Sequence, residues 1–222
     1  GQDIITLNAS TNKLVDGGSG SDSFTVTSDN NTNIKGGSGD DVFNVSGNFN
    51  KINDTNGNNQ ITLTGGDNTV IATGNGANKI VIDSSNNNVT LGNGNNTVGV
   101  QGNANTVFAN NITGNINIYG DENNVTNTRG DNNVTIRGNS NIYSGTLGQK
   151  NVSIYGNLNE ILTTNSDDSF IVVGNENSIE STGGNNEVDF RGNSNNYQGG
   201  EDVDAVRITG DGNTAKGGNA SD

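Results

Sequence analysis

Two aspartates each end a glycine-rich segment, and the two segments are nearly identical. They read GGSGSDSFTV from Gly17 to Val26 and GGSGDDVFNV from Gly36 to Val45. Glycine permits backbone angles that other residues avoid, and a carboxylate is a hard-oxygen ligand for a metal ion. The Phe-x-Val that follows is typical of a short strand with one buried face. Each copy therefore predicts a turn, a candidate metal ligand at Asp22 or Asp41, and a strand.

The strand part of this unit recurs along the whole chain, about every 18 residues. Its apolar-x-apolar pairs are Ile5/Leu7, Phe24/Val26, Phe43/Val45, Ile61/Leu63, Ile80/Ile82, Val98/Val100, Ile116/Ile118, Val134/Ile136, Val152/Ile154, Phe170/Val172, Val188/Phe190 and Val206/Ile208. Alternate side chains of a strand share one face, so each pair predicts two inward side chains. A weaker half-unit, Gly-Asn-x-Asn-x-apolar, lies between the pairs, as in GNFNKI from Gly47 and GNLNEI from Gly156.

This periodicity predicts an all-β fold, a parallel β-roll or β-solenoid. We expect about twelve rungs of about 18–19 residues, with two short strands in each rung. Residues 1–222 should form a single domain, because no linker interrupts the repeat. No capping unit is visible at either end of the chain. Uncapped ends would favour head-to-tail self-association, or the chain would be part of a longer repeat protein.

Two polar columns accompany the strands. The first, in the weaker half-unit, consists of Asn12, Asn31, Asn50, Asn68, Asn87, Asn105, Asn123, Asn141, Asn159, Asn177, Asn195 and Asn213. The second, two residues before each strong strand, consists of Asp3, Asp22, Asp41, Asn59, Asn78, Asn96, Gly114, Asn132, Lys150, Asp168, Asn186, Asp204 and Asp222. An amide both donates and accepts hydrogen bonds, so we expect stacked asparagines to bond from rung to rung.

The composition excludes several classes of function. The chain has no His and no Cys, which removes the usual zinc sites, Cys–His nucleophiles and Ser-His-Asp triads. Its net charge of −14 argues against nucleic acid or anionic lipid as a partner. No apolar run approaches the roughly 18 residues that span a bilayer. Acidic pairs such as Asp40–Asp41 point apart and form no convergent acid/base pair, so we expect no enzyme.

The two glycine-rich segments resemble the nonapeptide Gly-Gly-x-Gly-x-Asp-x-U-x of hemolysin-type calcium-binding repeats, the repeats-in-toxin group. The resemblance implies a secreted parallel β-roll with calcium (Ca2+) between stacked turns, bound by Asp carboxylates and turn carbonyls. It therefore implies a calcium site between the two segments. The residues of that site would be Asp22 and Asp41 with Gly17, Gly18, Gly20, Gly36, Gly37 and Gly39.

The resemblance implies further calcium sites near the ends of the chain. One would lie between Asp3 and Asp22, and another between Asp204 and Asp222, whose turns read GGEDVD and GGNASD. In the middle rungs the ligand column is mostly Asn, and neutral amides cannot balance a dication. We therefore expect calcium near the ends and asparagine ladders between. Lys150 lies in this column beside Asp168, and we hypothesise that its ammonium group replaces an ion there.

An outward column should stack on one surface at a spacing of about 5 Å. It consists of Tyr119, Arg137, Tyr155, Val173 and Arg191. Such a strip could bind a glycan or a protein edge, or its members could stack on one another, and we favour mutual stacking. We expect an extracellular or cell-surface structural protein of the surface-layer, adhesin or filament type. The alternative is a polysaccharide-binding accessory module of a secreted protein.

Overall fold

The computed structural model describes residues 1–8, 14–31 and 33–217 of the chain. These residues form β-strands joined by turns, and they contain no helix. The described part of the chain accordingly has no apolar helix of membrane-spanning length. Two strands form each rung, and about twelve rungs stack as a parallel β-solenoid. The predicted all-β fold, with two strands per rung, is confirmed.

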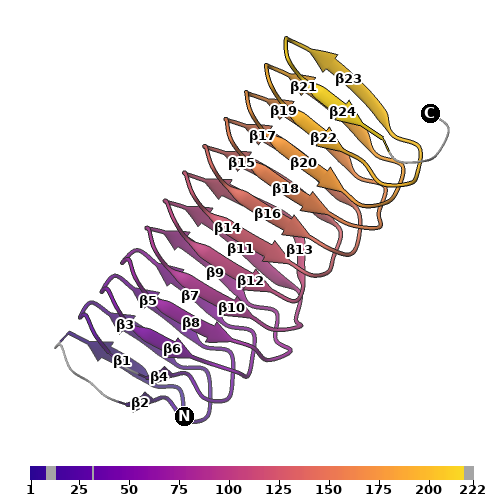
Figure 1. Ribbon diagram of the computed structural model, residues 1–222. Helices are drawn as coiled ribbons and strands as arrows, with labels where there is room; N and C mark the ends of the chain where they lie inside the picture. The colour runs from indigo at the N-terminus through magenta and orange to yellow at the C-terminus, as the bar shows by residue number, and fades with distance from the viewer. Residues whose placement is uncertain (9–13, 32, 218–222) are drawn as a thin grey trace. The chain divides into compact units, whose positions relative to one another are not determined.

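The chain divides into two compact units, Gly1–Ile112 and Thr113–Asp222. In the first unit the odd-numbered strands lie side by side in one parallel sheet and the even-numbered strands in a second (Figure 1). The strands are β1 (Ile4–Leu7), β2 (Val15–Asp16), β3 (Ser23–Val26), β4 (Ile34–Lys35), β5 (Val42–Val45), β6 (Lys51–Asn53), β7 (Gln60–Leu63), β8 (Thr69–Ala72), β9 (Lys79–Asp83), β10 (Asn88–Leu91), β11 (Asn96–Gln101) and β12 (Thr106–Ala109).

The second unit repeats the same two-sheet arrangement. Its strands are β13 (Ile112–Tyr119), β14 (Asn124–Asn127), β15 (Asn132–Arg137), β16 (Ile142–Gly145), β17 (Lys150–Tyr155), β18 (Glu160–Thr163), β19 (Ser169–Val173), β20 (Ser178–Ser181), β21 (Glu187–Arg191), β22 (Asn196–Gln198), β23 (Ala205–Thr209) and β24 (Thr214–Lys216). The prediction of one domain over residues 1–222 stays a prediction.

The register of the odd-numbered strands is the one that the apolar pairs predict. Ile5 lies opposite Phe24 in the first unit, and Val134 lies opposite Val152 in the second. The side chains of these pairs point between the two sheets, where Phe24 is fully buried and its ring stacks on that of Phe43 at 4.7 Å. The even-numbered strands contribute a second inward column to the two cores: Ile34, Ile52, Val70, Val89, Val107, Val125, Tyr143, Ile161, Ile179 and Tyr197.

From β3 onward, the turn after each odd-numbered strand contains a residue in the left-handed backbone region. This residue comes directly before the column asparagine and is of many types, including Phe49 (φ 56°), Ala104 (φ 54°) and Leu158 (φ 58°). The left-handed conformation costs a residue with a side chain about 1–2 kcal/mol. The buried asparagine that follows must therefore stabilise the turn, and its hydrogen bonds show how.

Candidate functional site

The first polar column is a continuous ladder of buried asparagine side chains. Asn141 is typical: its Oδ1 accepts the backbone N–H of Asn123 at 2.9 Å. Its Nδ2 donates to Asn159 Oδ1 at 3.1 Å and to the carbonyl oxygen of Gly120 at 2.8 Å. Each amide thus joins neighbouring rungs and satisfies a turn carbonyl. The predicted ladder is confirmed within each unit, except that Asn12 lies outside the described residues.

The second polar column lines the turn that leads into each odd-numbered strand. In the asparagine rungs, Oδ1 accepts the backbone N–H of the preceding rung, as Asn59 Oδ1 does from Asp41 at 2.9 Å. The Nδ2 atom donates to a carbonyl of its own turn, as Asn96 does to Gly94 at 2.7 Å. The carbonyl oxygens of these turns therefore face inward and are satisfied by an amide hydrogen.

At Lys150 the same position holds an ammonium group. The residue is fully buried, and Nζ donates to the carbonyl oxygens of Gly130, Leu147 and Gly148 at 2.8, 2.7 and 2.6 Å. Gly145 leaves room for the side chain, because a Cβ there would lie 2.6 Å from Lys150 Cε. Burial lowers the pKa of Lys150. The ammonium group lies among turn carbonyls, as the hypothesis of a replaced ion requires.

Asp22 and Asp41 place a carboxylate where the asparagine rungs and Lys150 have a hydrogen-bond donor. Their Oδ1 atoms accept the N–H groups of Asp3 and Asp22, both at 2.7 Å, in the same way as the asparagines. Their Oδ2 atoms are buried and have no hydrogen-bond partner among the described residues. Both residues are only 1% exposed. A buried oxygen without a donor is destabilising unless a proton or a cation meets it.

The two glycine-rich turns are neighbours in the stack, as predicted. Ser38 N–H donates to Gly18 O at 2.9 Å, and Gly20 N–H donates to Ser38 O at 2.8 Å. A Cβ on Gly17 would collide with Asp22 Oδ2 and with the carbonyl oxygen of Gly36. Gly17 therefore leaves a space in which two oxygen acceptors meet. The remaining motif glycines, Gly18, Gly20, Gly37 and Gly39, all have positive φ angles.

A third buried carboxylate, Asp54, belongs to this region and was missed in the sequence analysis. It is 2% exposed and follows β6, at the position that Gly36 occupies one rung earlier. A Cβ on Gly36 would collide with the Oδ2 atoms of both Asp41 and Asp54. Burial, and then the charge of Asp41, raises the pKa of Asp54 to about 7, and burial also raises the pKa of Asp41. Counting one period on from Gly36 would have found Asp54, but its turn, DTNGNN, lacks the motif.

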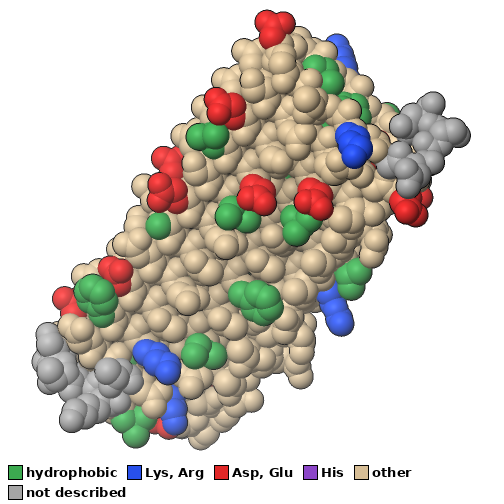
Figure 2. All heavy atoms as spheres, in the orientation of Figure 1, with side chains coloured by type: hydrophobic (Ala, Val, Ile, Leu, Met, Phe, Trp, Pro, Cys, Tyr) green, Lys and Arg blue, Asp and Glu red, His purple; other side chains and the backbone are tan. Residues whose placement is uncertain are grey.

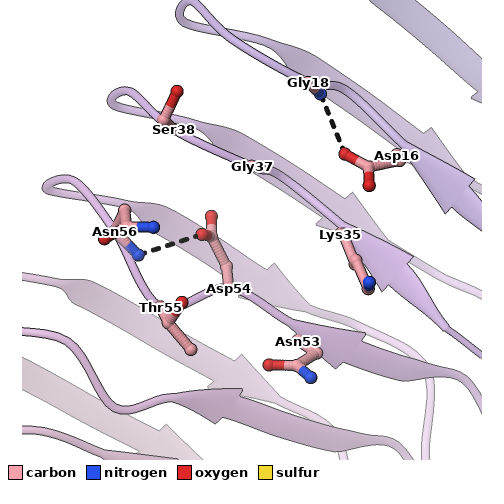
Figure 3. A pocket seen from close by; sticks show the side chains of 9 residues that line it. All are labelled: Asp16, Gly18, Lys35, Gly37, Ser38, Asn53, Asp54, Thr55 and Asn56. Carbon is pink, nitrogen blue, oxygen red and sulfur yellow. Dashed lines mark hydrogen bonds between the residues drawn. The ribbon is translucent and has the colours of Figure 1, made fainter.

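Asp54 also lines a groove of about 510 Å3 on the turns of the first unit (Figure 3). The groove is lined by Asp16, Gly18, Lys35, Gly37, Ser38, Asn53, Asp54, Thr55 and Asn56. Figure 3 shows the Asp54 side chain rising from its turn toward the turn of the preceding rung, with a hydrogen bond from the Asn56 N–H to Oδ1 at 3.4 Å. Of the three buried carboxylates, Asp54 is the one that lines this groove.

The other predicted ligands differ in their surroundings. Asp3 is exposed, so its carboxylate is not enclosed by the turns. Asp204 Oδ2 has no hydrogen-bond partner in the described part of the chain, and it fills the space left by Gly199. Asp222 lies outside the described residues. No group of three or more Asp, Glu, His or Cys side chains within the described residues is arranged to hold a metal ion.

The outward Tyr/Arg column lies in the predicted register on β13, β15, β17, β19 and β21. The guanidinium carbon of Arg137 lies 4.6 Å from the centroid of the Tyr155 ring. Arg191 pairs instead with Asp189 at 2.6 Å. These contacts favour mutual stacking over an open binding strip. On the face seen in Figure 2, the charged and the hydrophobic side chains are scattered.

Comparison with protein-family models found no match. Comparisons with characterised proteins and with solved structures also found none. The likeness to hemolysin-type repeats therefore rests on the two motif copies in the sequence. The fold defines the class of protein, a parallel β-solenoid with an apolar core and buried asparagine ladders in its turns.

Proposed function

We propose that the chain is an extracellular structural repeat protein, a scaffold of the surface-layer, adhesin or filament type. In this proposal calcium stabilises the motif-bearing turns, and asparagine ladders stabilise the other rungs. The asparagine ladders support a structural role, because their side chains are engaged in hydrogen bonds that hold neighbouring rungs together. Extracellular calcium-binding modules have dissociation constants of about 10⁻⁴–10⁻³ M, which suits a site of two carboxylates.

One observation carries the proposal: a single position in the turns holds three kinds of group. Asn96 offers an amide hydrogen to the turn carbonyls, and Lys150 offers an ammonium group. Asp22 and Asp41 offer only buried oxygen atoms without a donor. Calcium is a hard cation that binds carboxylate and carbonyl oxygens. Bound between Asp22 and Asp41, it would bring a positive charge to these buried oxygen atoms, which have no donor of their own.

Calorimetric titration with calcium tests this assignment. The wild-type chain should bind calcium, and Asp41→Asn should bind it at least tenfold more weakly, because the variant loses one of the two charges that balance the dication. Asp29→Asn is the matched control. It removes one charge from the opposite turn of the same unit, where Asp29 Oδ1 accepts the Asn48 N–H at 2.6 Å. An Asp41→Asn variant that binds calcium as the wild type does would contradict the proposal.

A further inference from the structure

The turn after β6 brings a second carboxylate to Asp41. The register of β4 and β6 places Ile34 opposite Ile52, so Asp54 lies beside Gly36 along the stack. The Oδ2 atoms of Asp41 and Asp54 both reach the space that the missing side chain of Gly36 leaves open. Both oxygens are buried and lack a hydrogen-bond partner in the described part of the chain. This second meeting point lies between the second motif turn and the turn that follows it in the stack.

Polar residues at the column position of Asp54 in the second unit bring a donor with them. Asn127 Nδ2 donates to Asn132 Oδ1 at 2.7 Å across its turn. Thr163 Oγ1 donates to Ser181 Oγ at 3.0 Å. Asp54 has no such hydrogen when it is ionised, so two like charges face one another in a buried space. That arrangement is unfavourable without a positive partner.

We propose that Asp41 and Asp54 bind a second divalent cation of the calcium type, in addition to the one between Asp22 and Asp41. The two carboxylates balance the charge of a dication, and the groove that Asp54 lines gives it a path from solvent. This inference rests on the proposed function and extends it to a turn that lacks the glycine-rich motif. Asp41, with one carboxylate, would then lie between two successive ions.

Counting bound ions by native mass spectrometry tests the inference, in mildly alkaline buffer with excess calcium. Asp54→Asn should bind one ion fewer than the wild-type chain. Asp22→Asn, which leaves the Asp41–Asp54 pair intact, should also bind one ion fewer. Asp29→Asn should bind as many ions as the wild type. In chelator, Asp54→Asn should unfold at a higher temperature than the wild type, because its amide can donate to Asp41 Oδ2.

The outcomes separate this inference from the proposed function. If Asp54→Asn retains the full number of ions, the second site is overturned while calcium at the motif turns stands. If Asp54→Asn lowers the affinity for calcium but not the number of bound ions, then Asp22, Asp41 and Asp54 share a single ion. The second site is again overturned. A wild-type chain that binds no calcium overturns both, and the two carboxylates then share a proton.

Discussion

At the scale of single residues, one position in the turn determines how each rung is satisfied. An amide, an ammonium group and a carboxylate occupy that position in different rungs, while the surrounding turn carbonyls keep their inward direction. The hydrogen-bonding capacity of this side chain therefore decides whether the buried polar groups of a rung satisfy one another or whether a cation is needed. Substitutions at Lys150 test this statement directly.

Replacing Lys150 with alanine should destabilise the second unit. The change leaves the carbonyl oxygens of Gly130, Leu147 and Gly148 without their donor in a buried site. We expect a loss of about 3 kcal/mol in the free energy of unfolding. Urea denaturation measures it. Lys150→Asn, which introduces the amide of the asparagine rungs, should lose less stability. An alanine variant as stable as the wild type would show that the hydrogen bonds from the Lys150 ammonium group to the turn carbonyls do not stabilise the fold.

The Asp54 carboxyl group should make the calcium-free chain less stable as the pH rises. Its pKa is raised from 3.8 to about 7, so the folded state binds the proton more tightly than the unfolded state. Its stabilising contribution is therefore fully present below pH 3.8 and is lost as the pH rises through about 7. Urea denaturation in chelator, compared between wild type and Asp54→Asn, isolates this group. A difference between the two proteins that does not change with pH would contradict the prediction.

At the scale of elements, the inner and outer asparagine ladders differ in burial. Asn141 lies in the buried ladder, whereas Asn139, two residues earlier, lies in an exposed ladder where its Oδ1 accepts the Asn157 N–H at 2.9 Å. Both ladders join the same rungs through the same kind of bond. Water can replace the exposed bonds but not the buried ones. The buried ladder should therefore carry most of the stabilisation.

Alanine substitutions in the two ladders test that difference. Asn141→Ala should cost about 2–4 kcal/mol in the free energy of unfolding, because it removes the acceptor of the Asn123 N–H and the donor to the Gly120 carbonyl in a buried site. Asn139→Ala should cost about 1 kcal/mol or less. Chemical denaturation of both variants provides the comparison. Equal losses would show that burial does not decide the strength of the ladder.

The elements also show what could be read from the sequence. The strand register was predictable because the apolar pairs encode both the alternation of a strand and the length of a rung. The left-handed turn residue was not predictable, because Phe49, Ala104 and Leu158 are side chains of different types. The asparagine that follows, and not the residue itself, stabilises this conformation. Asp54 was missed because the candidate site was sought through a motif. Its role depends on the distance across two rungs, which only the structure gives.

At the scale of the whole molecule, the excess of acidic residues predicts that the folded chain is stabilised by cations. The chain carries 24 acidic residues against 10 basic ones, and three of the acidic residues, Asp22, Asp41 and Asp54, are buried close together in the first unit. Among the described residues, only Arg191 and Asp189 form an ion pair. A bound dication would relieve this repulsion where it is strongest, because buried charges are screened least. Calcium should therefore stabilise the folded chain by mass action.

The most direct test of this account is thermal unfolding followed by circular dichroism, in millimolar calcium and in chelator. We predict a clearly higher midpoint in calcium and a smaller increase in magnesium, which retains its water shell more strongly. The double variant Asp22→Asn/Asp41→Asn should lose most of the calcium effect. An unchanged midpoint on removal of calcium from the wild-type chain would mean that the ladders and the backbone suffice, and the calcium-stabilised scaffold would be refuted.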